Sequence, residues 1–338
     1  MTGLINPEID ALLKDTSRSF FLTLEMLPKK IRGQVGLLYL LARVADTIAD
    51  TKTGSAKHLI DTLEKYDSVA QGISNELPEL DSVATLQGHD GERRLLGNVD
   101  KVISALDKYS EDDRKLIRKC LGIIIGGQTL DLQRFGPANE SGSISALNHP
   151  DELDDYAYRV AGSVGEFWTS ITLAHLINMN QEKESRFFAH GVRFGKALQM
   201  INILRDIPED LRFGRCYIPS DSLESVGISQ TDLLDAENME KFRPLYNQLL
   251  DVTTGHLDAA VEYVGMLPYT QFRLRAACML PILIAQNTVN MLREQNVLDA
   301  ENRVKVSRDE INSLIKKTKR SLLIPGASQK LLKTNRDT

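Results

Sequence analysis

The sequence predicts an all-α protein in a single domain, and three observations lead to that prediction. Apolar residues recur at three- and four-residue spacing through most of the 338 residues, which is the period of an amphipathic helix. Alternating apolar and polar residues, the pattern of a half-buried strand, are nearly absent. No Pro-, Gly- and Ser-rich linker divides the chain, so we expect one helical domain over residues 1–315.

The expected helices follow one another along the chain with clear start signals. They cover residues 31–51, 91–109, 112–135, 151–178, 183–212, 238–265 and 270–296. Ser110, followed by acidic residues, predicts an N-cap, and acidic residues after Pro150 mark a second start. Loops are expected at GISNELPEL, FGPANESGSIS and FGRCYIPSDSL. Residues 316–338 are basic and contain Pro and Gly, which predicts a frayed, disordered tail that touches anionic lipid.

Composition excludes several classes of protein. The net charge of −5 gives no reason to expect a nucleic-acid partner. Cys120, Cys216 and Cys278 form neither a zinc spacing nor a disulfide framework, which predicts a reducing, cytoplasmic setting. The start, MTGLINPEID, has no signal pattern, and the apolar stretch AACMLPILIA is too short to span a bilayer. We therefore expect a soluble protein that can rest on a membrane; the sequence predicts no oligomeric state.

Two aspartates stand in an apolar run, in the stretch VADTIADT at residues 44–51. Asp46 and Asp50 are four residues apart and share a helix face, with Arg43 one turn earlier. Two such carboxylates repel unless a cation lies between them, and unpaired charge is costly near a core. Oxygen ligands of this kind suit Mg²⁺, which takes one or two carboxylates with substrate phosphate and water. The alternative for a lone pair is a solvated face that carries two acids.

A second polar face lies in ALQMINILRDIPEDLRFGR. Spacings of three, four and four residues place these side chains on one face of the predicted helix: Gln199, Asn202, Asp206 and Asp210. Arg205 and Arg215 are close in sequence, and arginine binds diphosphate oxygens well. Pro208 removes a backbone hydrogen bond and should bend or restart the helix.

Two acid pairs on two apolar helices predict a walled cavity in which one helix faces the other. Metal ions held by the carboxylates and a diphosphate would help the diphosphate leave and generate an allylic carbocation. The apolar walls would bind a long hydrocarbon and keep water from the cation.

Four ordered motifs resemble those of the squalene/phytoene synthase family, the head-to-head trans-prenyl synthases, from about residue 15 to about residue 310. They are SRSFFLTLEMLP (17–28), LLYLLARVADTIAD (37–50), YAYRVAGSVG (156–165) and LQMINILRDIPEDLRFGRCYIP (198–219). The resemblance implies an isoprenoid-synthase-type helical bundle around a central cavity. It also implies a prenyl diphosphate substrate and Mg²⁺.

The resemblance assigns roles to particular residues. Asp46, Asp50, Asp206 and Asp210 would coordinate Mg²⁺ that bridges to diphosphate. The substrate would also contact, or be supported by, Ser17, Arg18, Ser19, Arg43, Gln199, Asn202, Arg205 and Arg215. Tyr39 and Tyr156 would line the reaction centre, Phe20 would face a carbocation, and the hydrocarbon tunnel would be shaped by Val160, Ala161, Gly162 and Gly165. Taken singly, each has a structural alternative: ordinary tyrosines and core Phe, a helix cap at Ser17, a tight helix contact in AGSVG.

The predicted reaction joins two farnesyl diphosphates through presqualene diphosphate to squalene, with reduction by NADPH, as in sterol or hopanoid biosynthesis. GLLYLLARVADTIADT and the segments 274–292 and 302–311 resemble squalene synthases. Lys305 and Arg308 are candidate contacts for a nicotinamide phosphate or a diphosphate, or plain surface. The alternatives are a phytoene or dehydrosqualene synthase and an enzyme that stops at presqualene diphosphate. A non-catalytic helical assembly factor is the alternative of another class, and the four retained aspartates argue against it.

Overall fold

Helices make up most of the computed structural model, which describes residues 5–17, 20–52, 54–138, 143–324 and 326–335. The all-α prediction is confirmed. A short parallel pair joins β1 (Ser145–Ala146) to β2 (Arg215–Cys216). The chain divides into two compact units, Met1–Asn139 with Ser170–Ile177, and Glu140–Thr169 with Asn178–Thr338. The single domain expected over residues 1–315 stays a prediction.

The first unit is organised around one long helix, α3. Its elements are α1 (Pro7–Ser17), α2 (Phe20–Met26), α3 (Lys29–Ala49), α4 (Ala56–Ala70), α5 (Asp81–Leu86), α6 (Asp90–Leu96), α7 (Val99–Ser104), η1 (Ala105–Lys108) and α8 (Glu111–Phe135). The helix α3 packs against α4, α6, α7 and α8. Leu37, Leu41 and Ile48 are fully buried, so apolar burial fixes most of its circumference. The face of α3 that carries Asp46 is only half-buried.

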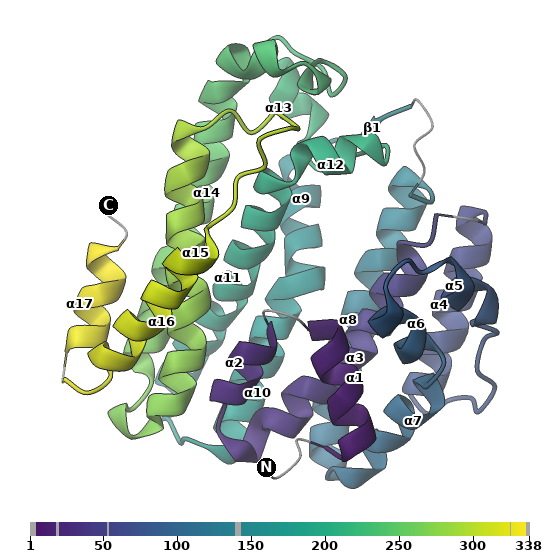
Figure 1. Ribbon diagram of the computed structural model, residues 1–338, viewed down its shortest axis with the longest axis vertical. Helices are drawn as coiled ribbons and strands as arrows, with labels where there is room; N and C mark the ends of the chain where they lie inside the picture. Colours follow the sequence, from purple (N-terminus) through teal and green to yellow (C-terminus); the bar gives the residue numbers. More distant parts are fainter. Residues whose placement is uncertain (1–4, 18–19, 53, 139–142, 325, 336–338) are drawn as a thin grey trace. The chain divides into compact units, whose positions relative to one another are not determined.

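The second unit is built on α11, α14 and α15, which pack side by side (Figure 1). Its elements are α9 (Pro150–Ala157), the π-helical turn η2 (Tyr158–Gly162), the first residues of α10 (Ser163–His175), α11 (Gln181–Arg205), α12 (Ile207–Arg212), α13 (Ser220–Glu224), η3 (Asp232–Leu234), η4 (Ala236–Asn238), α14 (Met239–Met266), η5 (Tyr269–Gln271), α15 (Phe272–Glu294), α16 (Arg308–Ser321) and α17 (Ala327–Thr334). Leu204, Leu250 and Leu292 are fully buried where the three long helices meet.

Local sequence signals placed several helix ends correctly. The Ser110 hydroxyl accepts from the Asp113 amide at 3.2 Å and caps α8. The expected restart at Pro208 is confirmed, because α11 ends at Arg205 and α12 begins at Ile207. The single helix expected over 91–109 is wrong: it is divided into α6, α7 and η1. The break falls at Gly97 and Asn98, both poor helix formers.

The C-terminal segment differs from the disordered tail that we expected from its sequence. Its described residues continue α16 and form α17, and Leu332 is fully buried. The Leu332 carbonyl accepts a hydrogen bond from the buried Gln286 amide at 2.9 Å. Packing against α15 thus orders a segment whose composition resembles that of a tail.

Gly165 of α10 and Gly191 of α11 bring two helices of the second unit into close contact. A Cβ added at Gly165 would lie 1.9 Å from the Gly191 carbonyl oxygen, and one added at Gly195 would lie 2.0 Å from the Ala161 carbonyl. Neither carbonyl can move without shifting its helix. The tight helix contact considered for AGSVG is therefore the role that the fold gives Gly165.

Replacing Gly165 with alanine tests this contact. Gly→Ala in a helix interior ordinarily stabilises by about 0.5–1 kcal/mol. At Gly165 we expect the opposite, a loss of about 1–3 kcal/mol in unfolding free energy, because the methyl group overpacks the contact. Guanidinium denaturation measures the difference. Gly88→Ala is the control, since nothing lies within 4 Å of its added Cβ. Equal midpoints for the two variants would contradict the close approach.

Candidate functional site

The first acidic cluster lies at the C-terminal end of α3, within the first unit. Asp46 is half-buried, and Asp50, which ends the helix, is exposed. Burial raises the pKa of Asp46 to about 7; the Asp50 carboxylate acts in the same direction, whereas Arg43 and a hydrogen bond from Gln128 oppose it. The Asp46 side chain still keeps 42% of its surface exposed. Protein atoms thus crowd this carboxylate without closing it to solvent.

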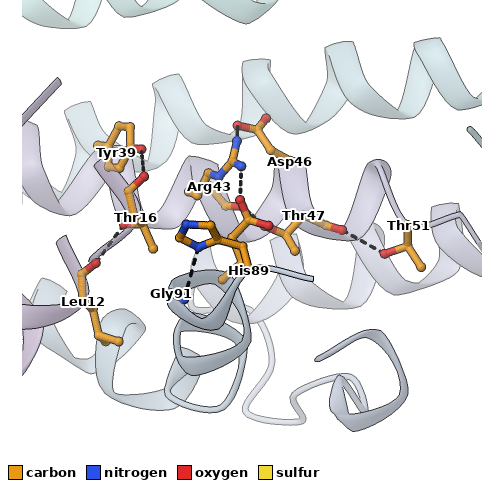
Figure 2. Close-up of polar contacts among 10 residues, drawn as sticks. Leu12, Thr16, Tyr39, Arg43, Asp46, Thr47, Thr51, His89 and Gly91 are labelled. Carbon is orange, nitrogen blue, oxygen red and sulfur yellow. Dashed lines mark hydrogen bonds and ion pairs between the residues drawn. The ribbon is translucent and has the colours of Figure 1, made fainter. Parts of the chain in front are cut away.

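Three helices supply the groups around Asp46. Arg43 Nη1 lies 3.8 Å from Asp46 Oδ2, and Arg43 Nη2 donates to Glu92 of α6. Figure 2 shows the guanidinium directed at Asp46. Gln128 of α8 donates to Asp46 from its amide nitrogen. Its amide oxygen is buried and accepts no hydrogen bond within the described residues. The Gln128 amide oxygen and the Asp46 carboxylate together form a set of oxygen ligands that suits a hydrated cation.

The residues predicted near the N-terminus have mixed outcomes. Tyr39 donates its hydroxyl to the Thr16 carbonyl at 2.9 Å and so ties α3 to the end of α1 (Figure 2). Ser17 is the last residue of α1, is buried, and donates to the Leu13 carbonyl. Arg18 and Ser19 lie outside the described residues, and α2 begins at Phe20, whose side chain also lies outside them.

The second acidic cluster lies at the end of α11, within the second unit. Arg205 grips Asp206 with two hydrogen bonds of 2.8 and 2.6 Å, and Arg303 adds a third of 2.7 Å. Burial disfavours the charged carboxylate, but the two guanidinium groups outweigh it and hold the pKa of Asp206 below its usual value. In contrast to Asp46, the charged form of Asp206 is stabilised by two arginines.

The remaining predicted residues of this motif surround Asp206. Asn202 is exposed, and its amide oxygen accepts from Arg205 at 3.1 Å. Gln199, one turn earlier on α11, is half-buried. Asp210 and Arg215 are half-buried and line one small hollow. The hollow also includes Cys216, whose pKa burial raises to about 12. The thiol is therefore not available as a nucleophile at neutral pH.

An aromatic pair lies in the second unit at the start of the third motif. Tyr156 stacks on Tyr217 with ring centroids 4.7 Å apart, and its hydroxyl donates to the Tyr217 hydroxyl at 3.2 Å. Both rings are buried, so Tyr156 is not an ordinary half-buried tyrosine. The π-helical turn η2 that follows carries Val160 and Ala161, which are half-buried. Such turns are frequent at functional sites.

Sequence reasoning missed Glu92, Gln128, Tyr217 and Arg303. Each meets its partner across a long stretch of chain, for example 97 residues between Arg303 and Asp206. Helical spacing carries no information about such pairs. Two of these residues lie in segments that the resemblance already covered: Tyr217 in the motif 198–219 and Arg303 in residues 302–311. The second segment drew attention to Lys305 and Arg308 instead, and both are exposed.

The donor set suits a hard cation that is completed by a ligand. Among the described residues, no three His, Cys, Asp or Glu side chains gather closely enough to form a metal site alone. Each unit instead offers two aspartates and amide oxygens from Gln or Asn. Oxygen ligands of this number fit Mg²⁺, which commonly keeps waters and takes substrate phosphate as further ligands.

Comparisons with known proteins agree with these motifs. The family model described as squalene/phytoene synthase matches residues 13–310. A bifunctional lycopene cyclase/phytoene synthase of Leptosphaeria maculans is 28% identical over 271 residues, which are 76% of this chain and 41% of that protein. A 15-cis-phytoene synthase of Synechocystis sp. is 26% identical over 255 residues, 74% of this chain and 66% of that protein. The chain thus spans less than two thirds of the length of these relatives.

Solved structures share the fold. A complex of TcSQS with a ligand has a TM-score of 0.80 at 20% identity, covering 97% of this chain and 90% of that one. A squalene synthase from Alicyclobacillus acidocaldarius has a TM-score of 0.61 at 18% identity, covering 87% and 97%. The predicted isoprenoid-synthase-type helical fold is confirmed by these likenesses.

Two aspartates of the first unit should respond oppositely to neutralisation in metal-free protein. Asp46→Asn removes repulsion from Asp50 while its amide oxygen still accepts from Gln128, so we expect stability unchanged or raised by about 0.5 kcal/mol. Asp113 is buried and accepts from Gln34 at 3.0 Å and contacts His175 at 2.7 Å. Asp113→Asn should therefore lose about 1–3 kcal/mol.

Chemical denaturation in EDTA measures both variants. A loss at Asp46→Asn as large as that at Asp113→Asn would mean that Asp46 is a structural residue rather than one kept for binding.

Proposed function

Since the chain belongs to the squalene/phytoene synthase family, we propose that it joins two prenyl diphosphates head to head and releases diphosphate. Enzymes of this family are prenyltransferases, and the isoprenoid substrate class follows from that membership. One observation carries the proposal: each unit holds a pair of aspartates beside an arginine, at the end of a helix that is otherwise packed in apolar core.

The first cluster would bind one end of a substrate. Bound Mg²⁺ would neutralise charge on the leaving diphosphate. Asp46 and Asp50 would hold it, with the unpartnered Gln128 oxygen as a further acceptor for the ion or its water. Arg43 is anchored by Glu92, so its guanidinium is held ready for diphosphate oxygens without a search through side-chain conformations. Ser17, Arg18 and Ser19 remain proposed contacts from the resemblance alone.

The second cluster would bind Mg²⁺ and diphosphate in the same way. Asp206 and Asp210 would hold Mg²⁺, supported by Asn202 and Gln199. Arg205 and Arg303 would then leave Asp206 and bind diphosphate together with Arg215. In the described structure Arg303 also lies 3.2 Å from Glu209, so the segment between α15 and α16 is tied to this motif by two ion pairs.

Tyr156 is the residue proposed for proton transfer or stabilisation of the carbocation. The hydroxyl-to-hydroxyl contact with Tyr217 gives it a fixed orientation in a buried environment. An electron-rich ring there favours nearby positive charge. Tyr39 and Phe20 remain proposed as catalytic residues from the resemblance alone. Val160 and Ala161 remain proposed for the hydrocarbon path, whereas Gly165 is already explained by helix packing.

The product proposed first is squalene, formed from two farnesyl diphosphates with NADPH as hydride donor. The segments 274–292 and 302–311 support it through their resemblance to squalene synthases. The curated relatives are named phytoene synthases, and this favours a second candidate at least as well: phytoene from two C20 diphosphates, without NADPH. Dehydrosqualene, or release at presqualene diphosphate, needs no reductant either.

One incubation series separates these products. Purified protein receives farnesyl or geranylgeranyl diphosphate with Mg²⁺, with and without NADPH, and lipids are identified by mass spectrometry. Squalene that appears only with NADPH supports the first candidate. Phytoene from the C20 substrate regardless of NADPH supports the second. Turnover of neither substrate overturns the proposed function in favour of a helical assembly factor.

Removing one acid from each cluster tests the shared role. Asp50→Asn and Asp206→Asn should each lower turnover by roughly 100-fold or more. Each removes a carboxylate that would hold the Mg²⁺ needed to neutralise the leaving diphosphate. Helicity by circular dichroism should not change. Asp61→Asn and Glu240→Gln neutralise exposed acids outside the clusters and serve as matched controls. Full activity in either cluster variant would contradict the assigned role.

Contact with a membrane is also part of the proposal, because a C30 or C40 hydrocarbon leaves water for lipid. Within the described ranges, no helix has both the length and the hydropathy to cross a bilayer. Peripheral association through the C-terminal basic segment is therefore proposed, and a cytoplasmic location stays a prediction.

A further inference from the structure

Four large apolar side chains are exposed together at one end of the second unit. Tyr269 and Phe272, at the start of α15, are 58% and 56% exposed, and Leu323 and Ile324, between α16 and α17, are 82% and 61% exposed. The Gly326 amide donates to the Tyr269 hydroxyl at 3.1 Å, so the two loops lie against each other. We call these four residues the apolar tip. Exposed apolar groups gathered in this way mark an interaction surface.

The apolar tip is held by buried polar contacts rather than left on a mobile tail. Arg275, which is 1% exposed, donates to the Val264 and Leu267 carbonyls and to the Ser328 hydroxyl, each at 2.7 Å. Its guanidinium also lies 4.8 Å from the centre of the Tyr269 ring. One buried arginine therefore fixes the end of α14, the start of α17 and the Tyr269 ring. Figure 1 shows α16 and α17, in yellow, beside α14 and α15.

Positive charge flanks the apolar tip. Residues 311–335 contain no Asp or Glu. They contain these exposed basic residues: Lys316, Lys317, Lys319, Arg320, Lys330 and Lys333. The acidic residues of α16, Asp309 and Glu310, lie in its first turn, at the far end from Leu323. The tip is thus apolar at its apex and basic on the two helices that lead to it.

We propose that the apolar tip and its flanking basic residues dock this protein on the surface of an anionic lipid bilayer. Basic residues near such a surface are attracted to acidic headgroups, while apolar and aromatic side chains insert at the headgroup level. A second copy of this chain is a poor occupant, since its own tip would bring the same positive charge face to face. The need for a bilayer rests on the proposed function, but the surface itself is argued from exposure, charge and contacts.

Two variants separate the apolar and the electrostatic parts of this surface. Leu323→Ser with Ile324→Ser removes apolar groups that are largely in solvent, so the fold should not suffer. Lys317→Gln, Lys319→Gln and Arg320→Gln together remove three charges. One basic residue near an anionic membrane contributes about a fivefold gain in binding. We expect each multiple variant to bind vesicles at least about tenfold more weakly.

Binding is measured by flotation of the full chain with vesicles of phosphatidylcholine alone or mixed with phosphatidylglycerol. Matched controls are Ile73→Ser with Leu234→Ser, which remove exposed apolar residues elsewhere, and Lys57→Gln with Lys241→Gln. The control proteins should float like the wild type. Added salt should weaken binding of the wild type more than that of the triple charge variant, because the variant has lost three of the six flanking charges.

Three results would overturn the proposal: no preference of the wild type for phosphatidylglycerol, equal flotation of the tip variants and the controls, or a wild-type dimer in sedimentation that Leu323→Ser with Ile324→Ser converts to monomer. The assay contains no prenyl diphosphate, so its outcome is independent of turnover. Activity of the same variants in detergent is measured in parallel. Lost flotation with retained turnover is the expected combination.

Discussion

The site depends on one constraint: its carboxylates stand on helices whose other faces are buried in the core. Asp46 lies on α3, whose other faces are buried, and protein atoms raise its pKa to about 7. Neutral partners alone cannot relieve two like charges at this spacing. The protein accepts that cost at a position where a cation and a diphosphate would remove it. Like charges placed close together near a core are unfavourable for stability, and such exceptions are expected at functional positions.

The two clusters meet this constraint in different ways. The first is left incompletely compensated: Arg43 lies 3.8 Å from Asp46 and is shared with Glu92, and one Gln128 oxygen accepts no hydrogen bond from the part of the chain that the structure describes. In the second, Arg205 and Arg303 neutralise Asp206. In the proposed function a cation would compete with these two arginines for Asp206, and the arginines would then bind phosphate oxygens. Arg205 and Arg303 would thus serve both the unliganded fold and the proposed reaction.

Buried polar contacts also explain how a basic C-terminal segment becomes ordered. Arg275, Gln286 and Asn335 connect α15 to α17 and the residue after it through buried hydrogen bonds. Buried polar groups of this kind are costly if unpaired, so they specify one position for α17. The consequence is that Leu323 and Ile324 remain at the surface at a fixed place, where they can meet lipid.

The sequence by itself determined the helical class and the restart at Pro208, because these depend on residues within one or two turns. Four motifs in order were enough to indicate the family. Only the tertiary structure decided that Gln128 and Glu92 support the first motif, that Arg303 meets Asp206, that Tyr217 orients Tyr156, and that residues 327–334 form a docked helix. Those pairings join segments far apart in the chain, and they are selected by packing and by the cost of leaving buried polar groups unpaired, neither of which leaves a local period in the sequence.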